Sequence, residues 1–151
     1  MTILERIVRL FLGVQSRSSP LAELFQDQAD ATKAIILEET GFPYGGVIKY
    51  TWWKSNSSEF FRKMCKGFTQ TEPDSDAPVL DLGTKGCVET LSSLIEEFEG
   101  PKNYTGNVRD GVVYRVACGT RDRQEVFTIS NPPAGSRHYQ LVTQIKEHVL
   151  K

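Results

Sequence analysis

The sequence predicts an α+β fold, in which an antiparallel sheet is built from two β-hairpins, each followed by a helix, with extra helices at the N-terminus. Three observations predict this fold. Runs rich in Val, Ile, Tyr, Trp and Thr alternate with a period of two at 33–53 and again at 112–130, and glycine-containing turns interrupt both. Apolar residues recur at helical spacing after each pair of runs. A polar link at 15–19 sets the apolar N-terminus apart as a separate block.

The chain of 151 residues is long enough for one domain, which we place at 1–151. It divides into an N-terminal helical segment at 1–31 and a sheet-and-helix core at 32–151. Hydrophobic residues make up 39% and charged residues 25%, which is typical of a globular protein. The net charge of −1 gives no general attraction to nucleic acid or to an anionic membrane, so neither is expected as a partner.

The N-terminal segment is predicted to contain a first amphipathic helix at 3–12 and a second that begins at Ser19-Pro20 and runs to about Ala31. Charged residues interrupt the first apolar stretch, which is also too short to span a bilayer. We therefore expect a cytoplasmic protein. The first helix either packs on its own domain or pairs with a second copy to form a homodimer.

The first hairpin is predicted from strands at 33–39 and 47–53, joined by a turn at 41–46. Trp52 and Trp53 must point to opposite faces of their strand, since side chains alternate. A helix is then expected to open at Ser57, because apolar residues follow at helical spacing: Phe61, Met64, Cys65 and Phe68.

The rest of the chain is predicted as a long exposed loop at 69–86, a helix at 87–98, a polar connection at 102–111 and the second hairpin. Its strands are placed at 112–118 and 124–130. The final helix is predicted from about Arg137 to the C-terminus, with its buried face formed by Leu141, Val142, Ile145 and Val149.

No residue pattern in the chain indicates catalysis. His138 and His148 are too far apart on one helix to bind one metal ion together, and motifs for phosphate binding, zinc proteolysis or a serine nucleophile are missing. We therefore predict a non-enzymatic protein with no catalytic residue, no metal and no cofactor.

The three cysteines are expected to be reduced thiols, with one disulfide as the alternative. Cys65 is predicted to be buried on a helix. Cys87 is predicted to open a helix after an exposed loop, where the helix dipole would stabilise its thiolate. A thiol reagent should then label Cys87 first and Cys65 last.

The turn of the first hairpin is the predicted binding site, formed by Phe42, Tyr44, Gly45 and Gly46. Aromatic rings on a rigid hairpin offer contact area to a protein partner at low entropic cost. The leading hypothesis is thus a protein-binding or regulatory protein. The alternative is a small-ligand-binding protein or enzyme with a pocket between sheet and helices, for which the candidate residues are Tyr50, Trp52, Tyr114 and Arg115.

The order of elements resembles the emfourin-type proteins, small inhibitors of thermolysin-like metalloproteases, over residues 33–150. The residues that carry the resemblance are Gly41-Phe42 with Gly45-Gly46, the helix Leu91–Phe98, Arg109-Asp110-Gly111 before Val112-Val113-Tyr114, and Val126–Ser130. The chain departs from these proteins in its N-terminal helices, its long segment at 69–86 and its lack of a Gly-Gly-Phe triplet. The resemblance implies a protease inhibitor whose partner is a metalloprotease.

Overall fold

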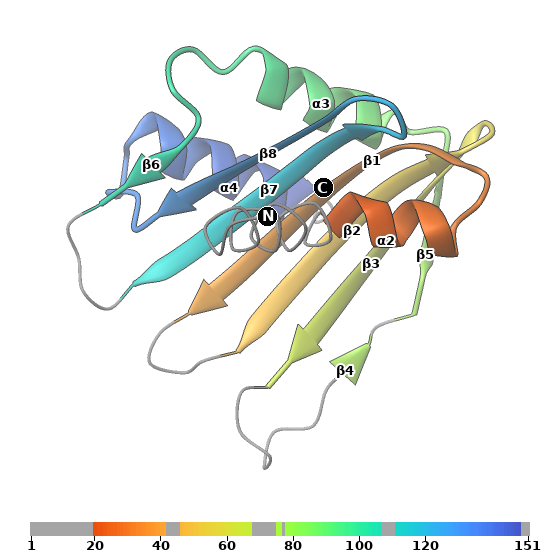
Figure 1. The fold of residues 1–151 in the computed structure, drawn as a ribbon, viewed down its shortest axis with the longest axis horizontal. Coiled ribbons are helices and arrows are strands. Elements are labelled where there is room, and N and C mark those ends of the chain that lie inside the picture. Colours follow the sequence, from red (N-terminus) through yellow and green to blue (C-terminus); the bar gives the residue numbers. More distant parts are fainter. Residues whose placement is uncertain (1–19, 42–45, 68–74, 77, 107–110, 149–151) are drawn as a thin grey trace, which may run out of the picture.

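The protein folds around one mixed β-sheet, with helices on both of its faces (Figure 1). The computed structural model describes residues 20–41, 46–67, 75–76, 78–106 and 111–148. Within these residues the helices are α2 (Pro20–Asp27), α3 (Cys87–Glu96) and α4 (Arg137–Glu147). The strands are β1 (Ala31–Gly41), β2 (Val47–Ser55), β3 (Ser58–Lys66), β4 (Ser75–Asp76), β5 (Leu80–Gly83), β6 (Tyr104–Thr105), β7 (Val112–Thr120) and β8 (Gln124–Ser130).

The eight strands lie in the order β4-β3-β2-β1-β7-β8-β6, and β5 pairs separately with β3. Neighbours along this path are antiparallel except at one edge, where β6 runs parallel to β8. Helices α3 and α4 cover one face of the sheet, and α2 covers part of the other. The long strand β1 lies at the centre and pairs with both β2 and β7.

The predicted fold class is wrong, because the first hairpin is not followed by a helix and the sheet is not purely antiparallel. Residues 58–66 form strand β3, which pairs with β2 along its whole length. The turn that joins them begins at Asn56, whose φ of 55° is one that asparagine tolerates. Phe60 and Phe61 then enter the two opposite cores. The backbone hydrogen bonds to β2 and the burial of one phenylalanine ring on each face stabilise a strand here, although the apolar residues also have helical spacing.

Two further boundaries differ from the prediction. The segment at 69–86, expected to be one loop, contains β4 and β5, both of which pair with β3. The second N-terminal helix ends at Asp27 as α2, and Ala31 already belongs to β1. The helix predicted at 3–12, and with it the pairing of two copies through that helix, lies outside the described residues.

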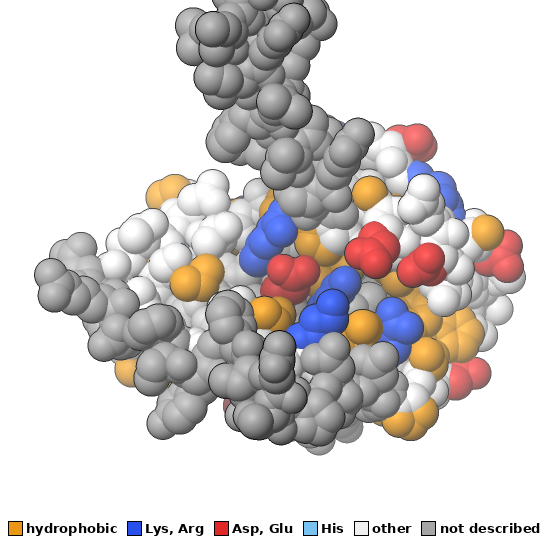
Figure 2. All heavy atoms as spheres, turned by 60° about the horizontal axis from the view of Figure 1, so that its bottom comes forward, with side chains coloured by type: hydrophobic (Ala, Val, Ile, Leu, Met, Phe, Trp, Pro, Cys, Tyr) orange, Lys and Arg blue, Asp and Glu red, His pale blue; other side chains and the backbone are white. Residues whose placement is uncertain are grey.

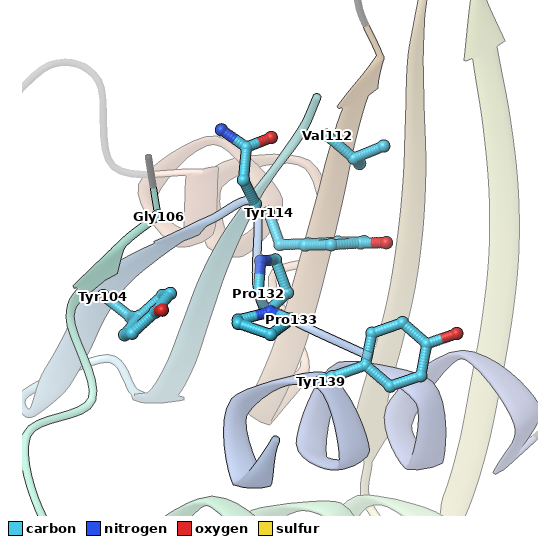
Figure 3. Close-up of a pocket in the computed structure, with 8 residues that line it drawn as sticks. Tyr104, Gly106, Val112, Tyr114, Pro132, Pro133 and Tyr139 are labelled. Carbon is cyan, nitrogen blue, oxygen red and sulfur yellow. The ribbon is translucent and has the colours of Figure 1, made fainter. Parts of the chain in front are cut away.

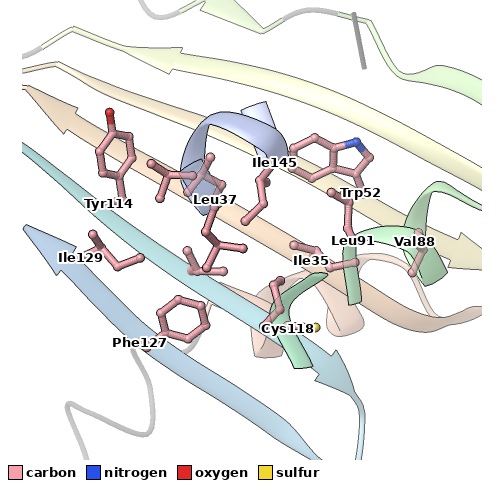
Figure 4. Close-up of a cluster of buried hydrophobic side chains, with 14 of the residues drawn as sticks. Ile35, Leu37, Trp52, Val88, Leu91, Tyr114, Cys118, Phe127, Ile129 and Ile145 are labelled. Atoms are coloured by element: carbon pink, nitrogen blue, oxygen red, sulfur yellow. The ribbon is translucent and has the colours of Figure 1, made fainter. Parts of the chain in front are cut away.

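The central strand shows how one segment supplies both cores. Ile35 and Leu37 point toward α3 and α4, while Ala34 and Ile36 point toward α2. Figure 4 shows side chains of the first core meeting across this interface, from the strands on one side and from α3 and α4 on the other. The adjacent tryptophans follow the same alternation, since Trp52 is buried in the first core and Trp53 in the second.

Helix α3 is attached to the sheet by a buried carboxylate. Glu59 of β3 is 2% exposed, and its two oxygens accept hydrogen bonds from the backbone N–H groups of Cys87 (2.9 Å) and Val88 (2.8 Å). The first N–H groups of a helix have no partner inside it, and the helix dipole favours a negative charge there. A side chain from a distant strand thus caps this helix.

Candidate functional site

A pocket of about 520 Å³ opens between β6, β7, the turn after β8 and the start of α4 (Figure 3). Its volume lies within the range of about 300–1,000 Å³ that is usual for small-molecule sites. The pocket is lined by Tyr104, Gly106, Val112, Tyr114, Asn131, Pro132, Pro133 and Tyr139. We call this the tyrosine pocket.

Tyr104 enters the tyrosine pocket from the edge strand β6. Its ring packs against the ring of His138, with the two centres 4.7 Å apart. His138 is itself placed by the Pro101 carbonyl oxygen, 2.8 Å from its Nε2, and by the ring of Phe98, 4.9 Å away. Figure 3 shows Pro132 and Pro133 between Tyr104 on one side and Tyr114 and Tyr139 on the other.

The turn at Asn131 closes one wall of the pocket. Asn131 has a φ of 50°, and its backbone N–H donates a 2.9 Å hydrogen bond to the Val112 carbonyl. Gly106 donates a similar bond of 2.8 Å to the Ser130 carbonyl. A Cβ atom at Gly106 would lie 2.4 Å from the Asn131 carbonyl oxygen, and one at Gly111 would overlap the Asn131 side chain. Gly106 is therefore required for this close approach, because a Cβ atom there would meet backbone, whereas a side chain at Gly111 would displace the Asn131 side chain.

Tyr114 joins the tyrosine pocket to a cluster of polar side chains on the same face of the sheet. Lys146 of α4 forms a 2.9 Å ion pair with Glu39 of β1, and its Nζ lies 5.9 Å from the centre of the Tyr114 ring. On β2, the ring of Tyr50 stacks on that of Trp52, with the two centres 6.3 Å apart. Lys63 Nζ lies over the Tyr50 ring, 5.6 Å from its centre. We call Glu39, Tyr50, Tyr114 and Lys146 the polar cluster.

The cluster keeps its tyrosines neutral and its lysine charged at neutral pH. Burial, and next the charge of Glu39, raise the pKa values of Tyr50 and Tyr114 above their ordinary value. For Lys146, burial lowers the pKa, but the hydrogen bond and charge of Glu39 outweigh it and leave the pKa raised. Both tyrosine hydroxyls can therefore donate hydrogen bonds.

The structure brings together only part of the residues that the sequence singled out for a pocket. Tyr114 lines it and Tyr50 lies in the adjoining polar cluster. Trp52 is fully buried in the core, and Arg115 points to the opposite face of the sheet because it neighbours Tyr114 on β7. The sequence analysis missed Tyr104, Asn131 and Tyr139, whose only signals were an aromatic ring in a polar connection, an Asn-Pro-Pro turn and an exposed helical tyrosine.

The predicted binding turn lies largely outside the described residues. This applies to Phe42, Tyr44 and Gly45. Gly46 is described, and its carbonyl accepts a 3.4 Å hydrogen bond from the Gly41 N–H. Protein binding through this turn, including inhibition of a metalloprotease, stays a prediction.

Elsewhere the surface carries mixed charges. On the face shown in Figure 2, acidic and basic side chains lie side by side with hydrophobic ones between them. Among the described residues, no group of three or more His, Cys, Asp or Glu side chains could hold a metal ion. None of the described helices is long and apolar enough to cross a membrane.

The cysteine environments reverse the predicted order of reactivity. Cys65 lies on a strand and is half-buried, whereas Cys87 and Cys118 are 8% and 6% exposed. Burial, followed by the charge of Glu59, raises the pKa of Cys87, and burial raises that of Cys118. The helix N-terminus at Cys87 is already occupied by a carboxylate, so it cannot activate the thiol.

We therefore expect an alkylating reagent to modify Cys65 well before Cys87 and Cys118 in the native protein, since exposure and thiolate content both govern the rate. Mass spectrometry of the digested protein after timed alkylation measures the three rates. In denaturant the three cysteines should react at similar rates, which is the control. Rapid native labelling of Cys87 would contradict the burial of the α3 N-terminus.

Comparison of the chain with models of known protein families finds no match, and neither does comparison with curated proteins.

Proposed function

We propose that this protein binds a small organic ligand in the tyrosine pocket. The observation that carries the proposal is a cavity of about 520 Å³ lined by tyrosines from three elements: Tyr104 of β6, Tyr114 of β7 and Tyr139 of α4. Ligand sites are typically concave and largely apolar, with a few polar groups that fix orientation. Tyrosine supplies both parts, an apolar ring and a hydroxyl.

The walls of the pocket are held in place without a ligand. The Tyr104 ring is packed against His138, and the Asn131 turn is closed by two backbone hydrogen bonds. A site that is already ordered loses less conformational entropy on binding, which favours affinity. This supports a binding site rather than a chance gap between elements.

A screen of small aromatic and aliphatic fragments, followed by ¹H–¹⁵N NMR, tests the proposal. We expect a subset of fragments to shift the backbone amides of Tyr104, Val112 and Tyr139 together. The substitution Y139A should weaken their binding by about tenfold, because it removes one ring from the contact. The Tyr139 side chain is 39% exposed, so its loss should leave the fold intact.

Q140A is the matched control. Gln140 is the next residue of α4, is exposed and does not line the tyrosine pocket. Its substitution should leave fragment affinity unchanged. Fragments that bind elsewhere on the protein, or equal affinities for wild type and Y139A, would refute the proposed site.

A further inference from the structure

We infer that the ligand of the tyrosine pocket is an organic acid, whose apolar body fills the pocket and whose carboxylate is bound by Lys146 with the hydroxyl of Tyr114. This inference rests on the proposed function and names the chemical class of the ligand. Its starting point is the position of the polar cluster, which adjoins the pocket through Tyr114.

Helix α4 connects the pocket to the lysine. Tyr139 and Lys146 are seven residues apart, so they lie on nearly the same side of the helix and about 10 Å apart along its axis. Tyr114 lies next to both residues, since its ring centre is 5.9 Å from Lys146 Nζ and it lines the tyrosine pocket together with Tyr139. A ligand in the pocket that extends along α4 therefore reaches Lys146.

The exposed member of the ion pair is the cation. The side chain of Lys146 is 32% exposed and that of Glu39 is 17% exposed. Glu39 Oε2, the oxygen that faces Lys146, has no access to solvent. The lysine is therefore the partner that a ligand reaches more readily, and its ammonium group carries three protons to donate.

Tyr114 adds a hydroxyl donor, and the Tyr50 ring of the polar cluster contacts a second cation. The Tyr114 hydroxyl is protonated at neutral pH, as tyrosine ordinarily is, and burial raises its pKa further. Lys63, over the ring of Tyr50, brings a second ammonium group to the same end of the sheet. A ligand cation would be repelled by the two lysines, whereas a carboxylate would form charge-assisted hydrogen bonds.

Three probes of one shape separate the possible ligand classes: 3-phenylpropanoate, its neutral amide 3-phenylpropanamide, and the cation 3-phenylpropylammonium. Their dissociation constants are measured by ¹H–¹⁵N NMR titration of the full chain. We expect the acid to bind about five- to tenfold more tightly than the amide, and the cation to bind most weakly.

Substitutions in the ion pair should change the affinity for the acid in opposite directions. K146M should reduce it to that of the amide, K146R should retain most of it, and E39Q should increase it because Lys146 loses its competing carboxylate. Affinity for the amide should hardly change in any of these variants, which separates loss of recognition from loss of folding.

K102M is the matched control. Lys102 also forms an ion pair, at 2.6 Å with Glu125, and lies 6.0 Å from a ring centre, but that ring belongs to Phe127, which does not line the tyrosine pocket, whereas Lys146 contacts the lining residue Tyr114. Its loss should leave all three affinities unchanged. If the amide or the cation binds as tightly as the acid, or if K146M leaves the acid's affinity intact, the inference is overturned while the proposed pocket stands. If neither these probes nor the fragments bind at the pocket, the proposed function fails and the inference with it.

Discussion

Substitution of Glu59 by alanine is expected to lower the free energy of unfolding by about 3 kcal/mol, the largest effect that we predict for one residue. The Glu59 carboxylate accepts two buried hydrogen bonds, from the backbone N–H groups of Cys87 and Val88. Removing it leaves two donors without a partner in a site closed to water, and each such group costs about 1–3 kcal/mol. Urea unfolding followed by circular dichroism measures the change.

Two further substitutions make this experiment specific. E59Q should be less damaging than E59A, because the amide oxygen can still accept one of the hydrogen bonds but the amide nitrogen cannot accept the other. E89A is the matched control, since Glu89 lies in the first turn of the same helix but its side chain is 57% exposed in an ion pair with Lys33. Its loss should cost less than about 0.5 kcal/mol. Equal effects of E59A and E89A would contradict the buried cap.

Substitution of Gly119 by alanine is expected to lower the free energy of unfolding by about 2–3 kcal/mol. Gly119 lies near the end of β7, at the turn into β8, and has a φ of 151°, which disfavours side chains. An added Cβ atom would lie 2.1 Å from the carbonyl oxygen of Arg123 and 2.8 Å from the Cα atom of Gln124. Both are backbone atoms, one of the turn and one of the paired strand β8, so the hairpin itself must distort.

G41A provides the comparison for G119A. Gly41 also ends a strand, but a Cβ atom there meets no atom of the described residues within 4 Å. The substitution should be neutral or slightly stabilising, because alanine restricts the unfolded chain more than glycine does. Thermal unfolding of both variants should therefore show a clear drop in the midpoint for G119A alone. Similar midpoints would show that the β7–β8 hairpin absorbs the extra methyl group.

The candidate site was only partly predictable from the sequence. Tyr114 could be proposed because polar aromatic side chains can line a ligand pocket, and the structure places it on the core face beside Val116. Tyr104 and Tyr139 could not be linked to it. They line the same pocket as Tyr114 only because β6 pairs in parallel with β8 and α4 packs back across the sheet. No local sequence pattern indicates such long-range pairings.

What the sequence by itself determined is the local periodicity of its regular segments. The alternation in β1, β2, β7 and β8 and the apolar stripes of α3 and α4 follow from residues close together in the chain, and the structure contains these elements. The opposite directions of Trp52 and Trp53 follow in the same way.

Where the local sequence pattern was ambiguous, only tertiary contacts determined the secondary structure and the environment of the side chains. Residues 58–66 form β3 because the edge of β2 offered backbone hydrogen bonds and two cores offered burial for Phe60 and Phe61. Cys87 is buried, and burial together with the charge of Glu59 from that unforeseen strand raises its pKa. In both cases the deciding interaction joins residues distant in the chain, and its free energy exceeds the weak preferences of the local sequence.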